Sequence, residues 1–317
     1  MSTLNGHTPR TLMQAVRYFT PDNADAYVAS VKWSDGRPVC PECGSVNAQR
    51  IKGRPTYQCR ERECRKQFSL KVGTIFQDSP LTLDKWLVGI WMIANCRNGV
   101  SSCEIARALG IKQQSAWHLL HRVRHAMKSD YSRRMRGSVE SDESFVGGSL
   151  RNKFSLDRKD RARARGKSVV HAMLKREGRS GPSEVRAFVI PAATAENVRA
   201  NLVKHVKVGN TWLHTDESVI YGWASSSFIH RWVNHMNEYV RGSVHTNTVE
   251  GYFSQLRRML QGTYIAVEPQ HLHAYVDELS YRCNVRKESE STRFDRLVRQ
   301  VIGKRLTYKD LTGGKDR

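Results

Sequence analysis

The chain has 317 residues, and its 52 Lys and Arg residues outnumber 30 Asp and Glu residues, which gives a formal net charge of +22. This length allows two or three domains, each with a hydrophobic core. The basic residues are spread through segments with folded patterns, so nucleic acid is a better partner than an acidic membrane surface. The longest apolar run, residues 86–94, is about half of a membrane span. We therefore expect a soluble cytoplasmic protein, associated with the nucleoid, with no membrane partner and with reduced cysteines.

Four paired cysteines follow a helical lead-in that we expect at residues 1–35. Two residues separate Cys40 from Cys43, fifteen separate Cys43 from Cys59, and four separate Cys59 from Cys64. This spacing is typical of a tetrahedral thiolate site, and so short a segment needs metal to supply the folding free energy that a small core lacks. We predict one structural Zn²⁺ in a zinc ribbon at residues 36–76. Two disulfides or four unrelated thiols are the alternative.

Basic side chains surround these cysteines, and Tyr57 and Phe68 lie between them in the sequence. A basic ribbon with interleaved aromatic residues favours contact with DNA phosphates. A solvated face or a protein-binding surface would have the same composition. The basic residues are Arg50, Lys52, Arg54, Arg60, Arg62, Arg65, Lys66 and Lys71.

Two helical patterns follow at residues 80–130. Ser101 and Glu104 form a capping-box pattern, and Gly110 is suited to end the first helix. In the second helix, residues 112–127, one apolar stripe would be buried and a polar face would point outward. This layout predicts a helix-turn-helix that binds DNA, with glutamines reading adenine edges and arginines holding phosphates, whereas a plain helical hairpin is the alternative. The predicted DNA-binding side chains are Gln113, Gln114, Ser115, His118, Arg122 and Arg124.

The segment 136–290 has an α/β pattern in which two acids follow strand-like runs. Asp142 lies within a run at 139–146, and Asp216 ends a run at 211–215. Between these acids we expect strands at 168–174 and 185–190 and a helix at 195–205, which together predict a layered α/β domain. The run 151–167 carries eight Lys or Arg residues, and we expect it to be an exposed loop that is mobile without DNA.

A third acid, Glu250, begins a helical pattern. Val249, Phe253, Leu256 and Leu260 share one helical stripe that would pack against a sheet, and Glu250 and Arg257 line its edge. Asn247 and Glu250 also match a capping box, in which the glutamate would serve only the helix N-terminus. Hard Mg²⁺ ions need several carboxylate oxygens from separate elements, so the three acids together favour a metal site.

Several motifs resemble the DDE transposases of bacterial insertion sequences, and specifically their ISXO-like group, which has an N-terminal zinc ribbon. The resemblance covers nearly the whole chain. It implies a ribonuclease-H-like catalytic core behind a zinc ribbon and an all-α helix-turn-helix segment, with a basic tail at 291–317. The matching residues are 141–148 (SDESFVGG), 215–216 (TD), 245–251 (HTNTVEG), 262–264 (GTY) and 271–278 (HLHAYVDE).

The resemblance also implies the roles of individual residues. Asp142 would bridge two Mg²⁺ ions, with Mn²⁺ as an alternative, and Asp216 and Glu250 would each hold one of them. Arg257 stands where the group usually has lysine, so a planar guanidinium replaces a compact ammonium group at this position. Asn247 is a rival third ligand, because some members of the group use asparagine. Glu143, Glu217 and His245 adjoin the acids and are more typical of surface or supporting groups. Arg258 is a predicted DNA contact.

These patterns predict a transposase that acts as a homo-oligomer on double-stranded DNA. It would bind the ends of its insertion sequence and catalyse Mg²⁺-dependent strand cleavage and transfer into target DNA. A zinc-ribbon and helix-turn-helix regulator without catalysis is the first alternative, although all three acids are retained. A nuclease of the same fold that cuts without strand transfer is the second.

Overall fold

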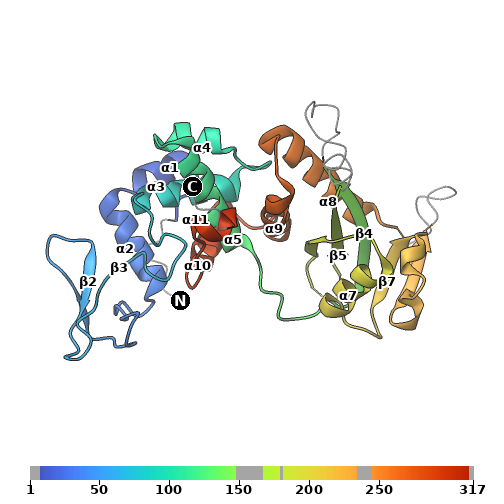
Figure 1. Cartoon of the computed structure of the whole chain (residues 1–317), viewed down its shortest axis with the longest axis horizontal. Helices are drawn as coiled ribbons and strands as arrows, with labels where there is room; N and C mark the ends of the chain where they lie inside the picture. Colours follow the sequence, from blue (N-terminus) through green and yellow to red (C-terminus); the bar gives the residue numbers. More distant parts are fainter. Residues whose placement is uncertain (1–7, 148–166, 179–180, 234–244, 314–317) are drawn as a thin grey trace. The chain divides into compact units, whose positions relative to one another are not determined.

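The computed structural model describes residues 8–147, 167–178, 181–233 and 245–313 (Figure 1). Almost all of the predicted basic loop at 151–167 lies outside these residues. The chain divides into two compact units, one formed by residues 1–127 with 287–317 and the other by residues 128–286. In the described part of the chain, no helix is both long and apolar enough to cross a bilayer.

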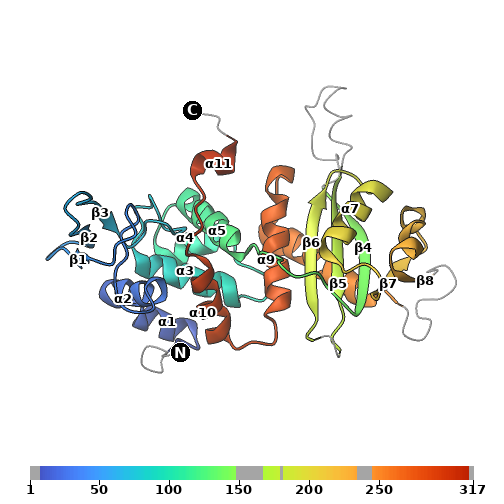
Figure 2. The same cartoon turned by 90° about the horizontal axis from the view of Figure 1, so that it is seen from below.

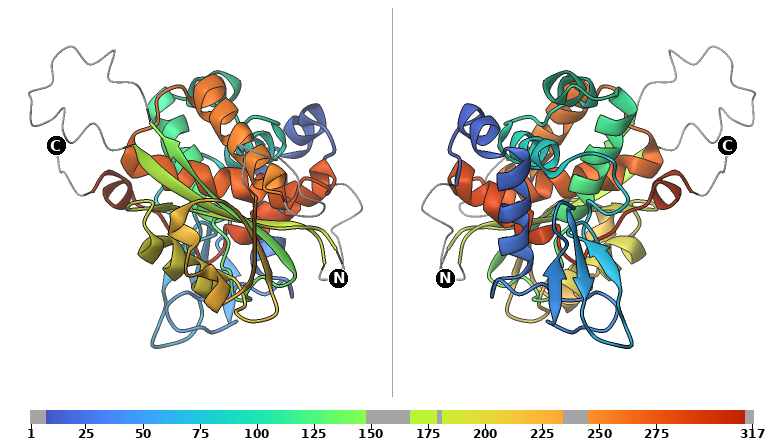
Figure 3. Two further views of the ribbon diagram at one scale, coloured as in Figure 1. Left: turned by 90° about the vertical axis from the view of Figure 1, so that its right-hand side faces the viewer. Right: turned by 90° about the vertical axis from the view of Figure 1, so that its left-hand side faces the viewer.

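The first unit contains a three-stranded antiparallel ribbon next to two short helices. Its strands are β1 (Ala48–Arg50), β2 (Thr56–Cys59) and β3 (Gln67–Ser69), in the order β1-β2-β3, as Figure 3 shows. The preceding helices are α1 (Leu12–Tyr18) and α2 (Pro21–Lys32). The ring of Tyr57 contacts Trp33 at the end of α2, with centroids 4.9 Å apart, and stacks on Phe68 at 5.8 Å. These aromatic side chains therefore pack the ribbon against α2, and contact between the basic ribbon and DNA stays a prediction.

Helices form the rest of the first unit. The longest apolar run of the sequence is α3 (Leu83–Asn95), which is buried over most of its circumference and forms the core of the unit. It contacts α1, α2, α4 (Ser102–Leu109), α5 (Gln113–Met127) and α10 (Glu290–Gln300), and a short α11 (Tyr308–Thr312) follows. Phe294, Leu297 and Val298 of α10 are buried. The first part of the predicted C-terminal tail is thus a core helix of this unit.

The second unit is built on a five-stranded mixed sheet. Its strands are β4 (Ser138–Val146), β5 (Ser168–Lys175), β6 (Glu184–Ile190), β7 (Trp212–Asp216) and β8 (Ile229–Val233), in the order β6-β5-β4-β7-β8. β4, β5 and β6 pair antiparallel, whereas β7 and β8 run parallel to β4. The structure thus confirms the predicted α/β layering. β8 is a short, largely exposed edge strand that the sequence pattern did not indicate.

Helices cover both faces of this sheet (Figure 2). On one face lie α8 (Asn247–Arg258), its π-helical continuation η5 (Met259–Tyr264) and α9 (Leu272–Asn284), which bury alternate residues of β5 and β6. The predicted stripe of α8 is confirmed, because Val249, Phe253 and Leu256 belong to this core and Leu260 packs beside it. On the other face lies α7 (Ala195–His205), followed in the chain by two 3₁₀ turns, η3 (Val219–Tyr221) and η4 (Ala224–Ser226). The face covered by α8 carries the candidate acids.

Candidate metal centres and nucleic-acid surface

The four paired cysteines meet at one point of the ribbon. Their sulfur atoms all lie within 4.8 Å of one another, and Cys40–Cys64 and Cys43–Cys59 are each 3.6 Å apart. A tetrahedron with Zn–S bonds of about 2.3 Å has S–S edges of about 3.8 Å. The arrangement fits a structural Zn²⁺ held by four thiolates, and among the described residues it is the only group that brings three or more candidate ligand atoms this close.

Each cysteine pair closes a tight turn whose last residue has positive φ. Gly44 follows Cys43 with a φ of 73°, and Arg65 follows Cys64 with a φ of 48°. Gly44 N donates to Cys40 O at 3.0 Å, and Arg65 N donates to Glu61 O at 3.2 Å. Glycine adopts this conformation without a steric penalty, whereas arginine does not. The backbone of Arg65 is therefore strained in the turn that places the Cys64 thiol next to the other three thiols.

Asp142 and Asp216 are neighbours on parallel strands. Glu140 of β4 is paired in register with His214 of β7. Two residues further along each strand stand Asp142 and Asp216, on the face that α8 covers. Side chains two residues apart share a face of a sheet, so the register alone places the two carboxylates side by side.

Glu250 lies in the first turn of α8 and does not act as a capping-box residue. The N-cap is Thr246 rather than Asn247, and no side-chain cap bond is formed there. Instead, the Thr246 hydroxyl donates to Glu250 Oε1 at 2.7 Å. Glu250 is exposed at the open end of the site. The capping-box interpretation of Asn247 and Glu250 is therefore wrong, which leaves the Glu250 carboxylate on the acid-bearing face.

A buried carboxylate that the sequence patterns did not single out holds α8 in place. Glu140 is completely buried, and its Oε2 accepts the backbone N–H groups of Thr248 (3.0 Å) and Val249 (2.9 Å). Its Oε1 forms an ion pair with Arg176 Nε at 2.6 Å. A carboxylate is favourable at a helix N-terminus because it meets unpaired N–H groups and the positive end of the dipole. The signal in the sequence was an acid two residues before Asp142, on the same strand face.

The electrostatics of the acids indicate a site built for cations. Burial raises the pKa of Asp142 to about 7, and the negative charges of Asp216 and Glu250 contribute to the rise, while a bond from Glu143 N opposes it. The three carboxylates do not all lie within 4.8 Å of one another. Two ions about 4 Å apart, each with about 2.1 Å bonds to oxygen, can be held by carboxylates up to about 8 Å apart. Carboxylates that do not converge on one point can therefore still hold a pair of hard ions.

The acids next to these candidate ligands point elsewhere. Glu143 lies on the opposite face of β4, where the Tyr221 hydroxyl donates to it and burial raises its pKa to about 8. Ser141 Oγ forms hydrogen bonds with His171 Nε2 at 2.8 Å and with Tyr221 at 3.0 Å in the same cluster. Glu217 is exposed. Glu143 therefore belongs to a buried polar network behind Asp142.

His245 and the arginines of α8 lie on the same side of the unit as the acids. Arg176 donates to His245 O at 2.6 Å, which joins His245 to the Glu140 cluster at the start of α8. Arg257 and Arg258 are exposed at the other end of α8, and Arg258 Nε donates to Ser254 O at 3.4 Å. Two turns of helix separate Arg257 from Glu250.

Helices α4 and α5 form as predicted, but their polar face is smaller than expected. Ser101 and Glu104 form both bonds of the capping box, and Gly110 has a φ of 60° at the C-cap, so these two predictions are confirmed. Gln113, Gln114 and Ser115 are exposed at the start of α5.

The predicted outward positions of Arg122 and Arg124 are wrong. Arg122 is 5% exposed and donates to Ile75 O (3.0 Å) and Gln77 O (2.7 Å), while Arg124 is 1% exposed. A loop covers this half of the helix, and Arg122 satisfies the loop's carbonyl groups. His118 is half-buried against the ring of Tyr308, and burial lowers its pKa to about 4. Only the first turn of α5 remains as a reading surface.

Two exposed basic residues next to that turn were missed by the sequence patterns. Arg107 of α4 and Lys112, just before α5, are both exposed. They became apparent only once the first turn of α5 was known to be open, and they are suited to phosphate contact on either side of it.

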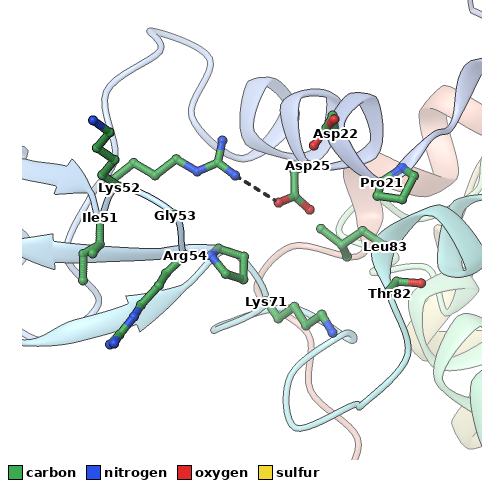
Figure 4. A pocket seen from close by; sticks show the side chains of 12 residues that line it. Pro21, Asp22, Asp25, Ile51, Lys52, Gly53, Arg54, Lys71, Thr82 and Leu83 are labelled. Atoms are coloured by element: carbon green, nitrogen blue, oxygen red, sulfur yellow. Dashed lines mark ion pairs between the residues drawn. The ribbon is translucent and has the colours of Figure 1, made fainter.

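The β1–β2 hairpin borders a cavity of about 560 Å³ that α2 and the start of α3 close from the other side. Arg50 forms an ion pair with Asp25 across this cavity at 3.6 Å, drawn as a dashed line in Figure 4. Figure 4 also shows Lys52 and Arg54 pointing away from Asp25, and both are exposed. Lys71 instead donates to two carbonyl groups of the next loop. The hairpin tip thus carries the available cations of this region, whereas Lys71 is structural.

Comparisons with known proteins agree with these two centres. A model of the ISXO2-like transposase domain matches residues 134–284, and a model of the transposase zinc-ribbon domain matches residues 20–67. The second unit is thus similar to the ISXO2-like transposase domain, and the cysteine ribbon is similar to the transposase zinc-ribbon domain. The uncharacterized protein in transposable element ISH50 of Halobacterium salinarum is 24% identical over 263 residues, which cover 78% of this chain and 86% of that protein. The ISXO2-like match contains Asp142, Asp216 and Glu250, and the zinc-ribbon match contains all four cysteines.

Proposed function

We propose that the protein is an insertion-sequence transposase that binds the ends of its element and catalyses Mg²⁺-dependent strand cleavage and transfer. The observation that carries this proposal is the convergence of three acids on one face of a mixed sheet. Asp142 and Asp216 are register neighbours, and the first turn of α8 brings Glu250 to the same face. We assign this unit to the ribonuclease-H-like fold, with three antiparallel strands continued by two parallel ones and helices on both faces.

In the proposed reaction, the acids hold two Mg²⁺ ions, or Mn²⁺ in their place. When bound, the ions would activate water or a 3′-hydroxyl and stabilise the leaving oxygen during in-line displacement at phosphorus. The charges of both Asp216 and Glu250 raise the pKa of Asp142, so Asp142 would be the ligand shared by the ions, while Asp216 and Glu250 would each hold one. Glu140 positions Glu250 by anchoring the N–H groups of α8 to β4. Arg257 would hold a DNA phosphate next to the scissile one.

End recognition is assigned to the first unit. The first turn of α5 exposes Gln113, Gln114 and Ser115, which would read base edges in the major groove. Arg107 and Lys112 would position the helix through phosphates, and Arg258 would contact DNA from the catalytic unit. We retain the domain limits 36–76 for the ribbon, 80–130 for the helix-turn-helix and 136–290 for the catalytic domain as proposals. A homo-oligomer on DNA would let one complex act on both ends of the element.

The test is a cleavage and joining assay on DNA that carries the inverted repeats flanking the coding region. Wild-type protein with Mg²⁺ should nick the element end and join it to a target duplex. Asp142→Asn, Asp216→Asn and Glu250→Gln keep the side-chain shapes but remove ligand charge, so each should abolish both steps and retain end binding. Glu217→Gln, which changes an exposed acid beside Asp216, is the matched control and should stay active.

The two alternatives give different results in the same assay. A nuclease without strand transfer would cut the end and leave the 3′-hydroxyl unjoined. A regulator would bind the repeats but leave both strands intact with any divalent ion. Either result from the wild-type protein would refute the proposed reaction.

A further inference from the structure

We infer that target DNA binds the part of the acid-bearing face formed by β7 and β8, with Arg231 as its phosphate contact. This inference rests on the proposed function and specifies where the second DNA enters the site. In the register of the sheet, Arg231 of β8 is paired with His214 of β7, which is itself paired with Glu140 of β4. Residues paired across parallel strands share a face of the sheet. Arg231 therefore lies on the face of Asp142 and Asp216.

The β7–β8 part of this face lies outside the core that covers the rest of it. That core, which α8 and α9 build, contains residues of β5 and β6, and none of its described members comes from β7 or β8. Figure 2 shows β7 and β8 at the end of the sheet remote from α9. Trp212 and Ile229, which are paired in register here, are 37% and 39% exposed. Two large side chains thus remain open to solvent on the acid-bearing face.

Arg231 is held against one of these side chains. It is exposed, and its guanidinium carbon lies 4.3 Å from the centroid of the Trp212 ring. It forms no ion pair with any carboxylate that the structure describes, so its charge is available to a ligand. Stacking on tryptophan limits the conformations of the guanidinium, and less entropy is then lost when it binds phosphate. The formal charge of +22 favours DNA over a protein partner on this face.

Joining requires two DNAs on different sides of the acids. The 3′-hydroxyl of the element end loses its proton and attacks a target phosphorus, while a P–O3′ bond of the target breaks and its oxygen takes up a proton. The attacking and leaving oxygens lie in line, on opposite sides of that phosphorus. The element DNA is assigned above to Arg257, which is seven residues beyond Glu250 on α8, about 10 Å along the helix.

The acids separate Arg257 from the β7–β8 surface. Along β4, Asp142 stands between Ser138, which is paired with Trp212, and Val146, which lines a cavity together with Arg257. Four residues separate Asp142 from each of these two positions, about 13 Å at the usual rise of a strand. With the element end on the Arg257 side, the β7–β8 side is the one left for the target.

The first arm of the test separates joining from cleavage. Pre-cut element ends with a free 3′-hydroxyl are mixed with increasing concentrations of a second duplex, and uncut ends are assayed in parallel. Arg231→Glu should raise the target concentration needed for half-maximal joining by about tenfold or more, because repulsion replaces a phosphate contact. Cleavage of the uncut ends involves no target and should proceed at the wild-type rate.

Arg199→Glu is the matched control. Arg199 is exposed on α7, which covers the other face of the sheet, and its guanidinium carbon lies 5.3 Å from the centroid of the Trp223 ring. This variant makes the same change of charge at the same kind of pair and should join like the wild type. Arg231→Lys keeps the charge and should retain most of the joining, whereas Trp212→Ala should show a smaller loss than Arg231→Glu.

The second arm measures target binding without chemistry. Asp142→Asn protein is saturated with unlabelled pre-cut ends, and the fluorescence anisotropy of a labelled random duplex is followed at several salt concentrations. Adding Arg231→Ala should weaken binding of the random duplex and lower the slope of log affinity against log salt by about one. The melting temperature should stay the same, because the side chain is exposed.

Each other outcome overturns the inference. Arg231→Glu protein that joins at the wild-type target concentration would show that this face does not hold the target. Equal losses of cleavage and joining would assign the face to the element end, and an equal loss in Arg199→Glu would reduce the effect to net charge. A changed sedimentation coefficient with normal joining would identify a contact between copies of the chain. A wild-type protein that neither cuts nor joins would remove the proposed function instead, and the anisotropy arm would still decide the surface.

Discussion

The carboxylate of Glu140 accepts the backbone N–H of Val249 at 2.9 Å, which ties the first turn of α8 to the central strand of the sheet. The same carboxylate pairs with Arg176, and no part of its side chain is exposed. The residue that follows Val249 is Glu250, the third candidate ligand. The position of this ligand therefore depends on a buried ion pair two residues before the first ligand, Asp142.

Glu140→Gln tests this dependence. The amide oxygen can still accept from α8, but Arg176 loses its charged partner inside the protein, so we expect unfolding to be easier by about 3 to 5 kcal/mol. Urea denaturation followed by tryptophan fluorescence gives the change. Glu217→Gln, an exposed acid in the same unit, should alter stability by less than about 0.5 kcal/mol. Equal stability of the two variants would show that the buried pair does not hold α8.

The contribution of Asp142 to the stability of the metal-free protein should fall as the pH rises from about 4 to about 7. The pKa of Asp142 is raised to about 7 in the folded state, so between these pH values the native state binds more protons than the unfolded state. The expected decrease is on the order of 2 to 4 kcal/mol. The stability of the wild type minus that of Asp142→Asn should show this decrease, because the histidines titrate alike in both proteins. Mg²⁺ should restore more stability at pH 8 than at pH 6, because it competes with that proton, and a difference that stays constant through this window would contradict the assignment.

Removal of zinc should unfold the ribbon. Purified protein should hold about one Zn²⁺ per chain, and Cys40→Ser or Cys59→Ser should release it, because each thiolate supplies one of four ligands. Elemental analysis measures the metal, and circular dichroism follows the ribbon. Cys103→Ser, at an exposed cysteine outside the cluster, is the control and should keep its zinc. Reduced, freshly prepared protein without zinc would refute a structural metal site.

End recognition should depend on the first turn of α5. Gln113→Ala and Gln114→Ala should lower the preference for the element end over random DNA by about 1 to 3 kcal/mol for each lost bidentate contact. Fluorescence anisotropy with both DNAs measures this ratio. Lys112→Ala should instead weaken both DNAs alike and reduce the salt dependence. Glutamine variants with the wild-type ratio would exclude this helix as the reader.

The sequence predicted those parts of the fold whose patterns are local. The strands that carry Asp142 and Asp216 are short runs with β-branched or aromatic residues around the acids, and the capping box at Ser101 needs only four residues. The parts that it missed depend on tertiary contacts. Helical periodicity cannot show that the loop at residues 75–77 covers Arg122, and a largely exposed edge strand such as β8 has too few buried residues to produce an alternating pattern.

The candidate site likewise contains residues that a local sequence pattern predicted and residues whose role depends on tertiary contacts. The spacing of the cysteines and the three acids were recognisable because metal ligands need specific residue types at specific separations. The role of Glu140 was hidden because its partners come from β5 and α8, more than thirty residues away in the chain. The capping-box interpretation of Asn247 failed because the N-cap of the helix is Thr246, one residue earlier than that pattern requires.

The most direct measurement of the central claim is metal rescue of cysteine variants in the cleavage assay. Sulfur binds Mg²⁺ poorly and accepts the softer Mn²⁺, so Asp142→Cys, Asp216→Cys and Glu250→Cys should each be inactive with Mg²⁺ and regain cleavage with Mn²⁺. Glu217→Cys and Asn247→Cys should be active with both ions, since neither side chain is a ligand in this account. A Glu250→Cys variant that is active with Mg²⁺, together with an Asn247→Cys variant that requires Mn²⁺, would contradict the account and assign the third ligand to Asn247.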